Sequence, residues 1–486
     1  MNAQHSSYLD ALRLDRGRRV PLHRQIYERM RSAIEQRMLQ PGDRVASARA
    51  LASELGVARS TVEAAYQQLT GEGYLVARGQ AGTVVSAHLP PPVSRAAEPR
   101  TVDRRSRKNA STLAGTPPHG TAPPLFQLGT PALDAFPRKL WTRLAARRLR
   151  MTSAADMFYG DPCGYAPLRQ AIATYLLVSR GIACRPEQVF VTAGYRASLA
   201  FVARTLLKPG DRVWTEDPGY PPTRDVLERA GHRPVAVPVD HEGMLVEHGI
   251  RHAPKARMAV VTPSHQAPLG VSLTLPRRLQ LLDWASRTNA WVVEDDYDGE
   301  YRYSGAPLPA LKSLDAHDRV IYAGSFSKTL SPGLALGYLV VPERLVDTCS
   351  EAARTWSNGC PQITQAAVAD FMSAGHFSRH LKKMRLLYAR RRAMLVAGLA
   401  AAFGEKVRVD LTSGGMHLIA RLTSRTGDRE LARRAQRAGL NAQPLSGRYA
   451  ARHNHSDKGL LLGFTNIAST DEAMRLCTRL RDALKG

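Results

Sequence analysis

The chain has 486 residues, of which 44% are hydrophobic and 23% charged, so it holds enough apolar material for two or three packed domains and is not globally disordered. The 68 Lys and Arg residues exceed the 42 Asp and Glu residues, and the net charge of +26 makes a polyanionic partner a reasonable expectation. No apolar run approaches the roughly 18 residues of a membrane-spanning helix, so we expect a cytoplasmic protein. The five cysteines lack CxxC spacing, which indicates neither a disulfide framework nor a zinc site.

Residues 89–124 divide the chain into a head, residues 1–88, and a body, residues 125–486. The dividing segment, LPPPVSRAAEPRTVDRRSRKNASTLAGTPPHGTAPP, is rich in Pro, Ser, Thr and Arg and has neither helical nor strand periodicity. This composition is typical of a linker. We therefore predict two folded parts joined by a flexible Pro- and Arg-rich tether.

The head opens with a predicted amphipathic helix over residues 21–38. Its apolar side chains recur four apart and so share one helix face: Leu22, Ile26, Met30, Ile34 and Met38. A second predicted helix follows Ser47, a good N-cap, and stops at Gly56. A third covers residues 59–73 after the turn GVA. Its buried stripe is predicted to be Val62, Tyr66 and Leu69.

Two helices joined by a tight glycine-containing turn are typical of a helix-turn-helix. The run YLVARGQAGTVVS that follows has two β-rich pieces around a Gly-rich turn, which we interpret as a wing. In this motif the second helix starts in the major groove, where Arg bonds guanine and Ser or Thr reach bases or phosphates. The candidate DNA contacts are therefore Arg44, Ser47, Arg49, Arg59, Ser60, Thr61 and, in the wing, Gly82.

Spacing alone leaves open a second interpretation of the head, a three-helix packing module with solvated arginines. The combined motifs favour the first. The LxxQI start, the PGDR turn, the core SARALASELGVARSTVEAAYQQLTGEGYL and the wing resemble a winged helix-turn-helix of the GntR type. This resemblance implies binding to double-stranded DNA.

The body alternates apolar runs with amphipathic segments. The predicted strands are QVFVTAG, RVWTED, ARMAVVTP, AWVVEDD and RVIYAGS, and helices such as RASLAFVARTLL and LPRRLQLLDWASRT separate them. This alternation predicts an α/β domain whose mainly parallel sheet is covered by helices. Ligands of such sheets bind at the carboxyl ends of the strands.

The run VIYAGSFSKTLSPG places Ser325, Ser327 and Lys328 at the end of one predicted strand. Hydroxyl groups there can hold a phosphate, and a partly desolvated lysine has the lowered pKa that Schiff-base formation needs. The run AWVVEDDYDGEYRY brings Asp295 and Tyr297 to the end of another strand. A carboxylate there could pair with a pyridinium nitrogen, and a phenol with a ring hydroxyl.

The run VTAGYRAS adds Gly194 and Tyr195 at a strand-to-helix turn, where backbone N–H groups and the helix dipole attract phosphate. Taken singly, these features are equally compatible with a solvated lysine, an acidic loop and an ordinary turn. Their joint order along the chain favours a single cofactor site.

From about residue 125 to the end, the body resembles a fold type I, aspartate-aminotransferase-like domain that binds pyridoxal 5'-phosphate. The motifs are YGDPCGYAPLR, VTAGYRASLAFVARTLLKPGD, EDPGYPP, VTPSHQAPLG, VVEDDYDGEYRY, GSFSKTLSPGLALGYLVVP, PLSGRYA and LLLGFTNI. That fold implies a smaller C-terminal α/β subdomain beside the parallel sheet. With its GntR-type head, the chain resembles the MocR-type transcriptional regulators, the class that includes GabR.

The resemblance implies a role for each candidate site residue. Lys328 matches the lysine that binds the cofactor covalently, Asp295 the partner of its pyridine nitrogen and Tyr297 the partner of its ring hydroxyl. The other matches are Tyr220, which stacks on the ring, His265 and Gln266 near the ring hydroxyl, Gly194, Tyr195, Ser325 and Ser327 around the phosphate, Tyr159 at the phosphate of the partner subunit, and Arg448, which binds a carboxylate of the substrate or effector.

Two departures from the family pattern concern ligand binding. The usual run SPGLRLGY is SPGLALGY here, so Ala335 replaces an arginine that pairs with the phosphate. Because the loss removes charge-assisted hydrogen bonds, we hypothesise that Arg196 compensates for it. In addition, Pro222 stands near an effector-binding arginine of GabR-like proteins, so the effector need not be a GABA-like amino acid.

The expected function is that of a homodimeric, pyridoxal-phosphate-dependent transcriptional regulator that senses an amine or amino acid. Two alternatives stay open. One is a pyridoxal-phosphate-dependent aminotransferase with an accessory DNA-binding head. The other is a regulator whose effector is pyridoxal phosphate itself.

Overall fold

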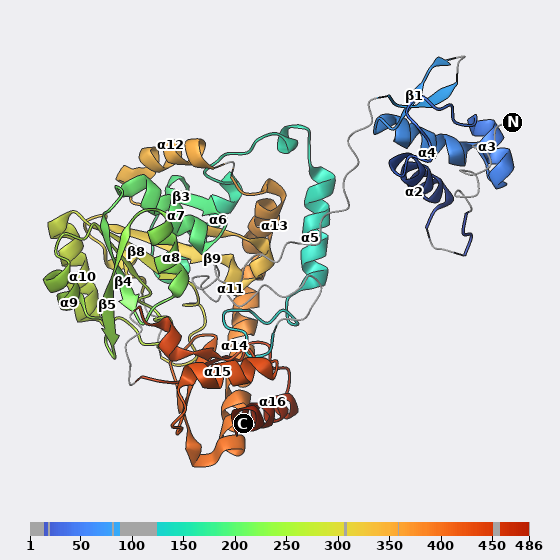
Figure 1. Ribbon diagram of the computed structural model, residues 1–486. Helices are drawn as coiled ribbons and strands as arrows, with labels where there is room; N and C mark the ends of the chain where they lie inside the picture. The colour runs from blue at the N-terminus through green and yellow to red at the C-terminus, as the bar shows by residue number, and fades with distance from the viewer. Residues whose placement is uncertain are drawn as a thin grey trace. The chain divides into compact units, whose positions relative to one another are not determined.

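The residues described by the computed structural model are 14–17, 20–79, 82–87, 124–305, 309–357, 359–450 and 457–485. The chain divides into two compact units, residues 1–116 and 117–486, each of which can be followed in Figure 1. The predicted linker, residues 89–124, lies outside the described residues except for its last residue. No helix in the described ranges is long and apolar enough to cross a membrane.

In its described residues, the head unit has three helices and a two-stranded antiparallel sheet: α2 (Leu22–Glu35), α3 (Ala48–Leu55), α4 (Arg59–Gly71), β1 (Leu75–Ala77) and β2 (Thr83–Val85). Ser47 Oγ caps α3 by accepting a hydrogen bond from the backbone N–H of Ala50 (3.1 Å), and Gly56 ends it with φ 60°. Val62 and Leu69 are fully buried. The predicted helix-turn-helix and wing are confirmed.

One detail of the head prediction is wrong, because Met38 does not continue the apolar face of the first helix. Helix α2 ends at Glu35, and Arg37 adopts a left-handed φ of 58° that turns the chain. Met38 is consequently 43% exposed, and Leu39, at 5%, enters the core instead. A four-residue spacing identifies a face only as far as the helix continues.

The body is built on a sheet with the strand order β3-β10-β9-β8-β7-β4-β5-β6. The strands are β3 (Val189–Thr192), β4 (Arg212–Asp217), β5 (Arg233–Asp240), β6 (Gly243–Met244), β7 (Met258–Val261), β8 (Trp291–Asp296), β9 (Val320–Ser325) and β10 (Gly337–Val340). From β5 to β9 the pairing is parallel, whereas β10 and β6 run antiparallel to their neighbours. The predicted, mainly parallel sheet is confirmed.

Helices cover both faces of this sheet (Figure 1). Their bounds are α5 (Arg138–Met151), α6 (Ala166–Arg180), α7 (Tyr195–Leu206), α8 (Pro221–Arg229), α9 (Val246–His252), α10 (Leu275–Thr288), α11 (Phe326–Thr329), α12 (Val346–Trp356) and α13 (Gln362–Ser373). Successive strand residues point to opposite faces, so Val293 packs with α7, α8 and α12 and Val292 packs with α9 and α10. The strands are therefore apolar on both sides.

A smaller C-terminal subdomain follows the large sheet. Its antiparallel strands have the order β11-β12-β14-β13, and its elements are α14 (His376–Phe403), β11 (Val407–Asp410), β12 (His417–Leu422), α15 (Asp428–Arg437), β13 (Gln443–Pro444), β14 (Leu460–Gly463) and α16 (Thr470–Lys485). Helix α14 packs against α16, and α15 packs against β13. The expected C-terminal α/β subdomain is confirmed.

We predict that Leu199→Ala destabilises the body far more than Leu177→Ala. Leu199 on α7 is fully buried among the side chains behind β3 and β9, whereas Leu177 on α6 is 56% exposed. Truncating a buried leucine leaves a cavity and costs about 2–5 kcal/mol, while an exposed change stays within about 0.5 kcal/mol. Urea unfolding of the full chain, followed by tryptophan fluorescence, measures both values. Equal losses for the two variants would contradict the assigned core.

Candidate functional site

Strands β3, β4, β7, β8 and β9 point the same way, so their carboxyl ends meet at one edge of the large sheet. Polar side chains gather there because the strands themselves are packed on both faces. The ends of these strands and the segments that follow them carry the predicted cofactor residues, in chain order Gly194 and Tyr195, Tyr220, His265 and Gln266, Asp295 and Tyr297, and Ser325 to Lys328.

Lys328 lies on α11, directly after β9. Its Nζ donates a hydrogen bond to the backbone carbonyl of Gly129 (2.8 Å). Burial lowers the pKa of the Lys328 amine, and the charges of Asp298 and Asp295 oppose that shift. A lowered pKa favours the uncharged amine, which is the form that attacks a carbonyl carbon.

Asp295 lies near the end of β8, opposite Ala323 of β9, and is 6% exposed. No hydrogen bond or ion pair with another described residue satisfies its carboxyl group. Burial raises the pKa of Asp295 well above its usual range, and the charges of Asp296 and Glu216 raise it further, while Lys328 lowers it. A buried carboxyl group in this position is suited to a cationic N–H donor.

Two tyrosines lie beside these charges. Tyr195, at the start of α7, shares a hydrogen bond with Thr223 (Oη to Oγ1, 2.7 Å), and its ring lies 6.0 Å from that of Tyr220. Tyr220 is 40% exposed, so part of its ring is open to a planar ligand. Gly194 begins α7 with φ 91°, which leaves the first backbone N–H groups of the helix directed at the edge.

The candidate phosphate hydroxyls lie on the neighbouring turn. Ser325 Oγ caps α11 by accepting a hydrogen bond from the backbone N–H of Ser327 (3.1 Å). Arg196 is exposed on the first turn of α7 and has no ion-pair partner among the described residues. Ala335 is exposed as well, with φ 48°. Arg196 is thus free to meet an anion, and its compensating role stays a prediction.

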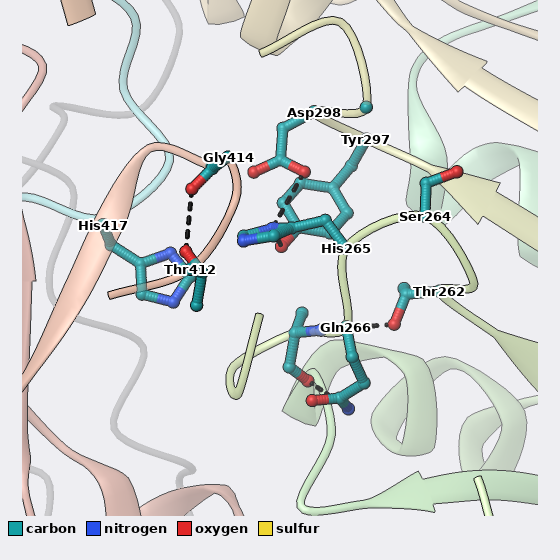
Figure 2. A network of polar contacts seen from close by, with 12 residues as sticks. Thr262, Ser264, His265, Gln266, Tyr297, Asp298, Thr412, Gly414 and His417 are labelled. Carbon is teal, nitrogen blue, oxygen red and sulfur yellow. Dashed lines mark hydrogen bonds and ion pairs between the residues drawn. The ribbon is translucent and has the colours of Figure 1, made fainter. Parts of the chain in front are cut away.

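His265 and Tyr297 come together as the sequence suggested (Figure 2). His265 is 6% exposed, and its Nδ1 lies 3.0 Å from Tyr297 Oη and 3.2 Å from Asp298 Oδ1. Burial raises the pKa of the Tyr297 phenol, and the charges of Asp298 and Asp295 add to the rise. The phenol therefore keeps its proton and can donate it in a hydrogen bond.

The amide of Gln266 is directed elsewhere. Its Nε2 donates to Glu216 Oε2 (3.1 Å) and to the backbone carbonyls of Pro218 (2.8 Å) and Ala267 (2.9 Å). These bonds tie the loop after β7 to the loop after β4. A role for Gln266 at the ring hydroxyl stays a prediction.

Arg448 reaches this edge from the C-terminal subdomain. Its backbone carbonyl accepts hydrogen bonds from Gly219 N (3.2 Å) and Arg224 Nη2 (3.4 Å), and the N–H of Ala450 donates to Asp217 Oδ1 (2.6 Å). Three bonds thus fasten the Arg448 segment to the loop after β4.

The guanidinium group of Arg448 is left without an acid. Burial lowers its pKa, and the phenol of Tyr220 is the group that opposes this shift. The described residues provide it with no ion pair. A half-buried guanidinium without an ion pair is a suitable partner for a ligand carboxylate.

Three residues of the site were not predicted from the sequence. Asp298 and Glu216 are acids adjoining recognised motifs, DDY and DPGY, and that adjacency is the signal that could have found them. Gly129 carries no such signal, because only the fold brings it to Lys328. The φ of 65° at Gly129 favours glycine, and a Cβ there would lie 2.7 Å from Lys328 Nζ and would displace the amine.

The donor set fits pyridoxal phosphate. Lys328 supplies an amine, Asp295 a buried acid without a protein partner, and Tyr297 a phenol. The first turn of α7, with Ser325 and Ser327, supplies donors for a phosphate.

The predicted DNA contacts lie on the accessible ends of α3 and α4. Arg44, Arg49, Arg59 and Ser60 are exposed and Thr61 is half-buried. The hydroxyl of Ser47 is already engaged as the cap of α3. Gly82 in the wing has φ 88°, and a Cβ there would lie 2.9 Å from Arg44 Nε, so the wing packs on that guanidinium. Arg59 Nε contacts Glu63 Oε1 at 2.7 Å.

Tyr159 belongs to a short exposed apolar run. Met157, Phe158 and Tyr159 are 79%, 75% and 81% exposed, and the Phe158 and Tyr159 rings meet edge to face at 5.4 Å. An exposed apolar run of this kind normally packs against another protein, a membrane or a ligand.

Comparison with protein families matches both units. Residues 22–85 match the family "Bacterial regulatory proteins, gntR family", and residues 133–453 match "Aminotransferase class I and II". The second match covers more than half of the chain.

Two relatives and one solved structure are similar to this chain over most of its length. The chain is 40% identical to the probable rhizopine catabolism regulatory protein MocR of Rhizobium meliloti, over 93% of this chain and 92% of that protein. It is 34% identical to the HTH-type pyridoxine biosynthesis transcriptional regulator PdxR of Corynebacterium glutamicum, over 90% and 91%. The α-aminoadipate aminotransferase LysN of Thermus thermophilus, complexed with N-(5'-phosphopyridoxyl)-L-leucine, is 29% identical with a TM-score of 0.67, over 74% and 92%.

We predict that Glu216 makes stability fall as the pH rises. Burial raises its pKa from 4.5 to about 7. Between these values the folded state binds more protons than the unfolded state, so the free energy of unfolding decreases from pH 4.5 to 7 and then levels off. Glu216→Gln removes this titration and should shrink the decrease by up to about 3 kcal/mol. Urea unfolding at pH 5 and pH 8 measures it.

Glu228→Gln, an exposed change on α8, is the matched control and should keep the wild-type pH dependence. If Glu216→Gln showed the same decrease between pH 5 and 8 as the wild type, Glu216 would be charged throughout.

Proposed function

Because the chain belongs to the MocR-type family, in which a GntR-type head is joined to a class I and II aminotransferase domain, we propose that it is a transcriptional regulator that uses pyridoxal phosphate to sense an amine or amino acid. The head binds double-stranded DNA and the body binds cofactor and effector. A DNA-bound regulator would work in the cytoplasm.

The proposed function of the body rests on three ionisable side chains at the edge of the large sheet. Asp295 is buried and Lys328 and Arg448 are half-buried at one sheet edge, and none of the three forms an ion pair with a described residue. Burying unpaired ionisable groups is costly, so a site that retains three of them is built for ligands that supply the partners.

The cofactor, when bound, supplies an aldehyde carbon that captures amines and a ring that draws electrons from them. The residues of this chain position it. Asp295 would accept the pyridine N–H, Tyr297 would donate to the ring hydroxyl, and Tyr220 would stack on the ring. The uncharged Lys328 amine would hold the aldehyde end, and the helix start at Gly194 would hold the phosphate.

The effector class follows from Arg448 and Lys328. An amine would compete with Lys328 for the cofactor, and a carboxylate on the same molecule would pair with the guanidinium of Arg448. Because the Arg448 segment is fastened to the loop after β4 by backbone bonds, an occupied guanidinium would favour one arrangement of the subdomain over another, which is how a ligand shifts a conformational equilibrium.

A homodimer is part of the proposal. The exposed run of Met157, Phe158 and Tyr159 offers a hydrophobic contact for a second copy. A cavity of about 250 Å³, lined in part by Phe190, Phe201 and Trp356, offers an apolar recess near the start of α7. Paired heads would also match paired half-sites on DNA.

The rival function, an aminotransferase with an accessory DNA-binding head, is not favoured. The relatives that match over nearly the whole chain are named regulators. A regulator whose effector is pyridoxal phosphate itself stays an alternative. It is supported by the similarity to PdxR, a regulator of pyridoxine biosynthesis, and by Ala335, which replaces the phosphate-binding arginine of the family pattern.

We predict that Lys328→Ala abolishes covalent retention of the cofactor. Borohydride reduction of the wild type with pyridoxal phosphate should add one reduced cofactor to the intact mass, located by peptide mapping at Lys328. The variant should gain none at this site, because no amine remains there. Lys255→Ala, an exposed change, should label like the wild type. Equal labelling of the Lys328 and Lys255 variants would contradict the assignment.

We predict that Arg59→Ala weakens specific DNA binding about 5- to 150-fold, because it removes a major-groove contact worth about 1–3 kcal/mol. Arg24→Ala is a matched control, since Arg24 pairs with Glu28 as Arg59 pairs with Glu63, one turn along an exposed helix. A DNA site selected from a random pool by the wild type, titrated by fluorescence anisotropy at fixed salt, gives both affinities. A Kd for Arg59→Ala no weaker than that for Arg24→Ala would exclude the α4 start from base contacts.

A further inference from the structure

A cluster of buried polar atoms stands behind the proposed cofactor site. Asp298 is 1% exposed, and neither of its carboxylate oxygens accepts a hydrogen bond from a described residue, although Oδ1 lies 3.2 Å from His265 Nδ1. His265 Nε2 and Ser264 Oγ are likewise buried without a partner. All three residues line one cavity of about 20 Å³, together with Arg302. Orphaned polar atoms in one place require an explanation.

The ring of His265 is held in one orientation. Gly415 and Gly270 close on it with φ 93° and 71°. A Cβ at Gly415 would lie 2.2 Å from Cε1 of the ring, and a Cβ at Gly270 would lie 2.9 Å from Nε2. Because both glycines leave room only for the ring edge, Nδ1 remains directed at Asp298 and Tyr297.

That orientation determines where the imidazole proton lies. Asp298 Oδ1 lies 3.2 Å from Nδ1 without hydrogen-bond geometry, but its negative charge would repel the lone pair of an unprotonated Nδ1, so the contact favours the proton on Nδ1. Tyr297 Oη, at 3.0 Å, lies within reach of the same N–H and accepts it too. The phenol's own O–H is then left to donate to a group other than His265.

The second histidine of the region does not disturb this arrangement. His417 approaches from β12 (Figure 2), with its ring 6.0 Å from that of His265. Its Nε2 donates to the backbone carbonyl of Pro268 (2.9 Å), and burial lowers the pKa of His417 to about 4. His417 is therefore neutral at pH 7 and does not compete for the charge of Asp298.

We infer that Asp298 is a positioning residue of the cofactor site: through the Nδ1–H of His265 it fixes the Tyr297 phenol as a donor to the ring hydroxyl of the cofactor. One water in the cavity completes the network by bonding His265 Nε2, Ser264 Oγ and a carboxylate oxygen of Asp298. A space of about 20 Å³ with several polar walls is the size and chemistry that a single buried water needs. The inference rests on the proposed cofactor site.

The first test measures the imidazole proton without any cofactor. Full-length protein labelled with ¹⁵N-histidine is examined by solid-state NMR, and the His265 signals are assigned by their loss in His265→Asn. The wild type should show His265 with the proton on Nδ1. In Asp298→Asn, whose amide can also donate, the other tautomer should become populated. An unchanged tautomer in Asp298→Asn overturns the inference, whatever the protein binds.

The second test measures cofactor affinity by the absorbance of added pyridoxal phosphate. Asp298→Asn should weaken binding about tenfold, the size of one charge-assisted hydrogen bond. His265→Asn places an amide N–H near the position of Nδ1 and should retain most of the affinity, whereas His265→Gln, which places it near Nε2, should bind as weakly as Asp298→Asn. A merely structural role for His265 would not separate the Asn and Gln variants.

Glu294→Gln is the matched control, because Glu294 is a fully buried carboxyl group in the same strand as Asp295 whose oxygens accept the N–H groups of Leu311 and Lys312 instead. It should leave the His265 tautomer as in the wild type. If the wild type itself binds no cofactor, the proposed cofactor function fails while the tautomer measurement still decides the role of Asp298. If the wild type binds cofactor and Asp298→Asn binds it equally well, the inference alone fails.

Discussion

The chemistry of the body depends on the burial of unpaired charge at one edge of a sheet that is apolar on both faces. Val292 and Val293 point into separate cores on opposite sides of β8, so a polar residue can be accommodated only where the strand ends. Asp295 and Lys328 are placed at those ends by parallel neighbours, and burial shifts the pKa of each toward its uncharged form. Packing elsewhere supplies the stability that lets these groups remain unpaired.

The C-terminal subdomain takes part in the site through backbone bonds. The carbonyl of Arg448 is held by Gly219, and the N–H of Gly415 donates to the carbonyl of Tyr301 (2.9 Å). One contact lies beside the group that would meet a carboxylate, and the other lies beside the His265 ring. The C-terminal subdomain would thus contact the site at two places, beside the guanidinium that would bind a carboxylate and beside the His265 ring.

Much of this arrangement could be predicted from the sequence, because it depends on residues that lie close together in the chain. The strand-to-helix runs around Gly194 and Lys328 contain the site residues themselves, so their positions follow from the local pattern. The caps at Ser47 and Gly56 mark the two ends of α3. What could not be predicted depends on contacts far apart in the chain. The meeting of Gly129 with Lys328 spans 199 positions, and the hydrogen bond from Gln266 to Glu216 spans 50.

The left-handed backbone at Ala335 bears on how the site could change over generations. With φ 48° and ψ 42°, this exposed position already carries the strain that any side chain with a Cβ meets there. Exchanging alanine for a longer residue would add no backbone penalty and would displace no buried neighbour. Longer side chains at 335 are therefore compatible with the fold, separately from the core that forms the sheet edge.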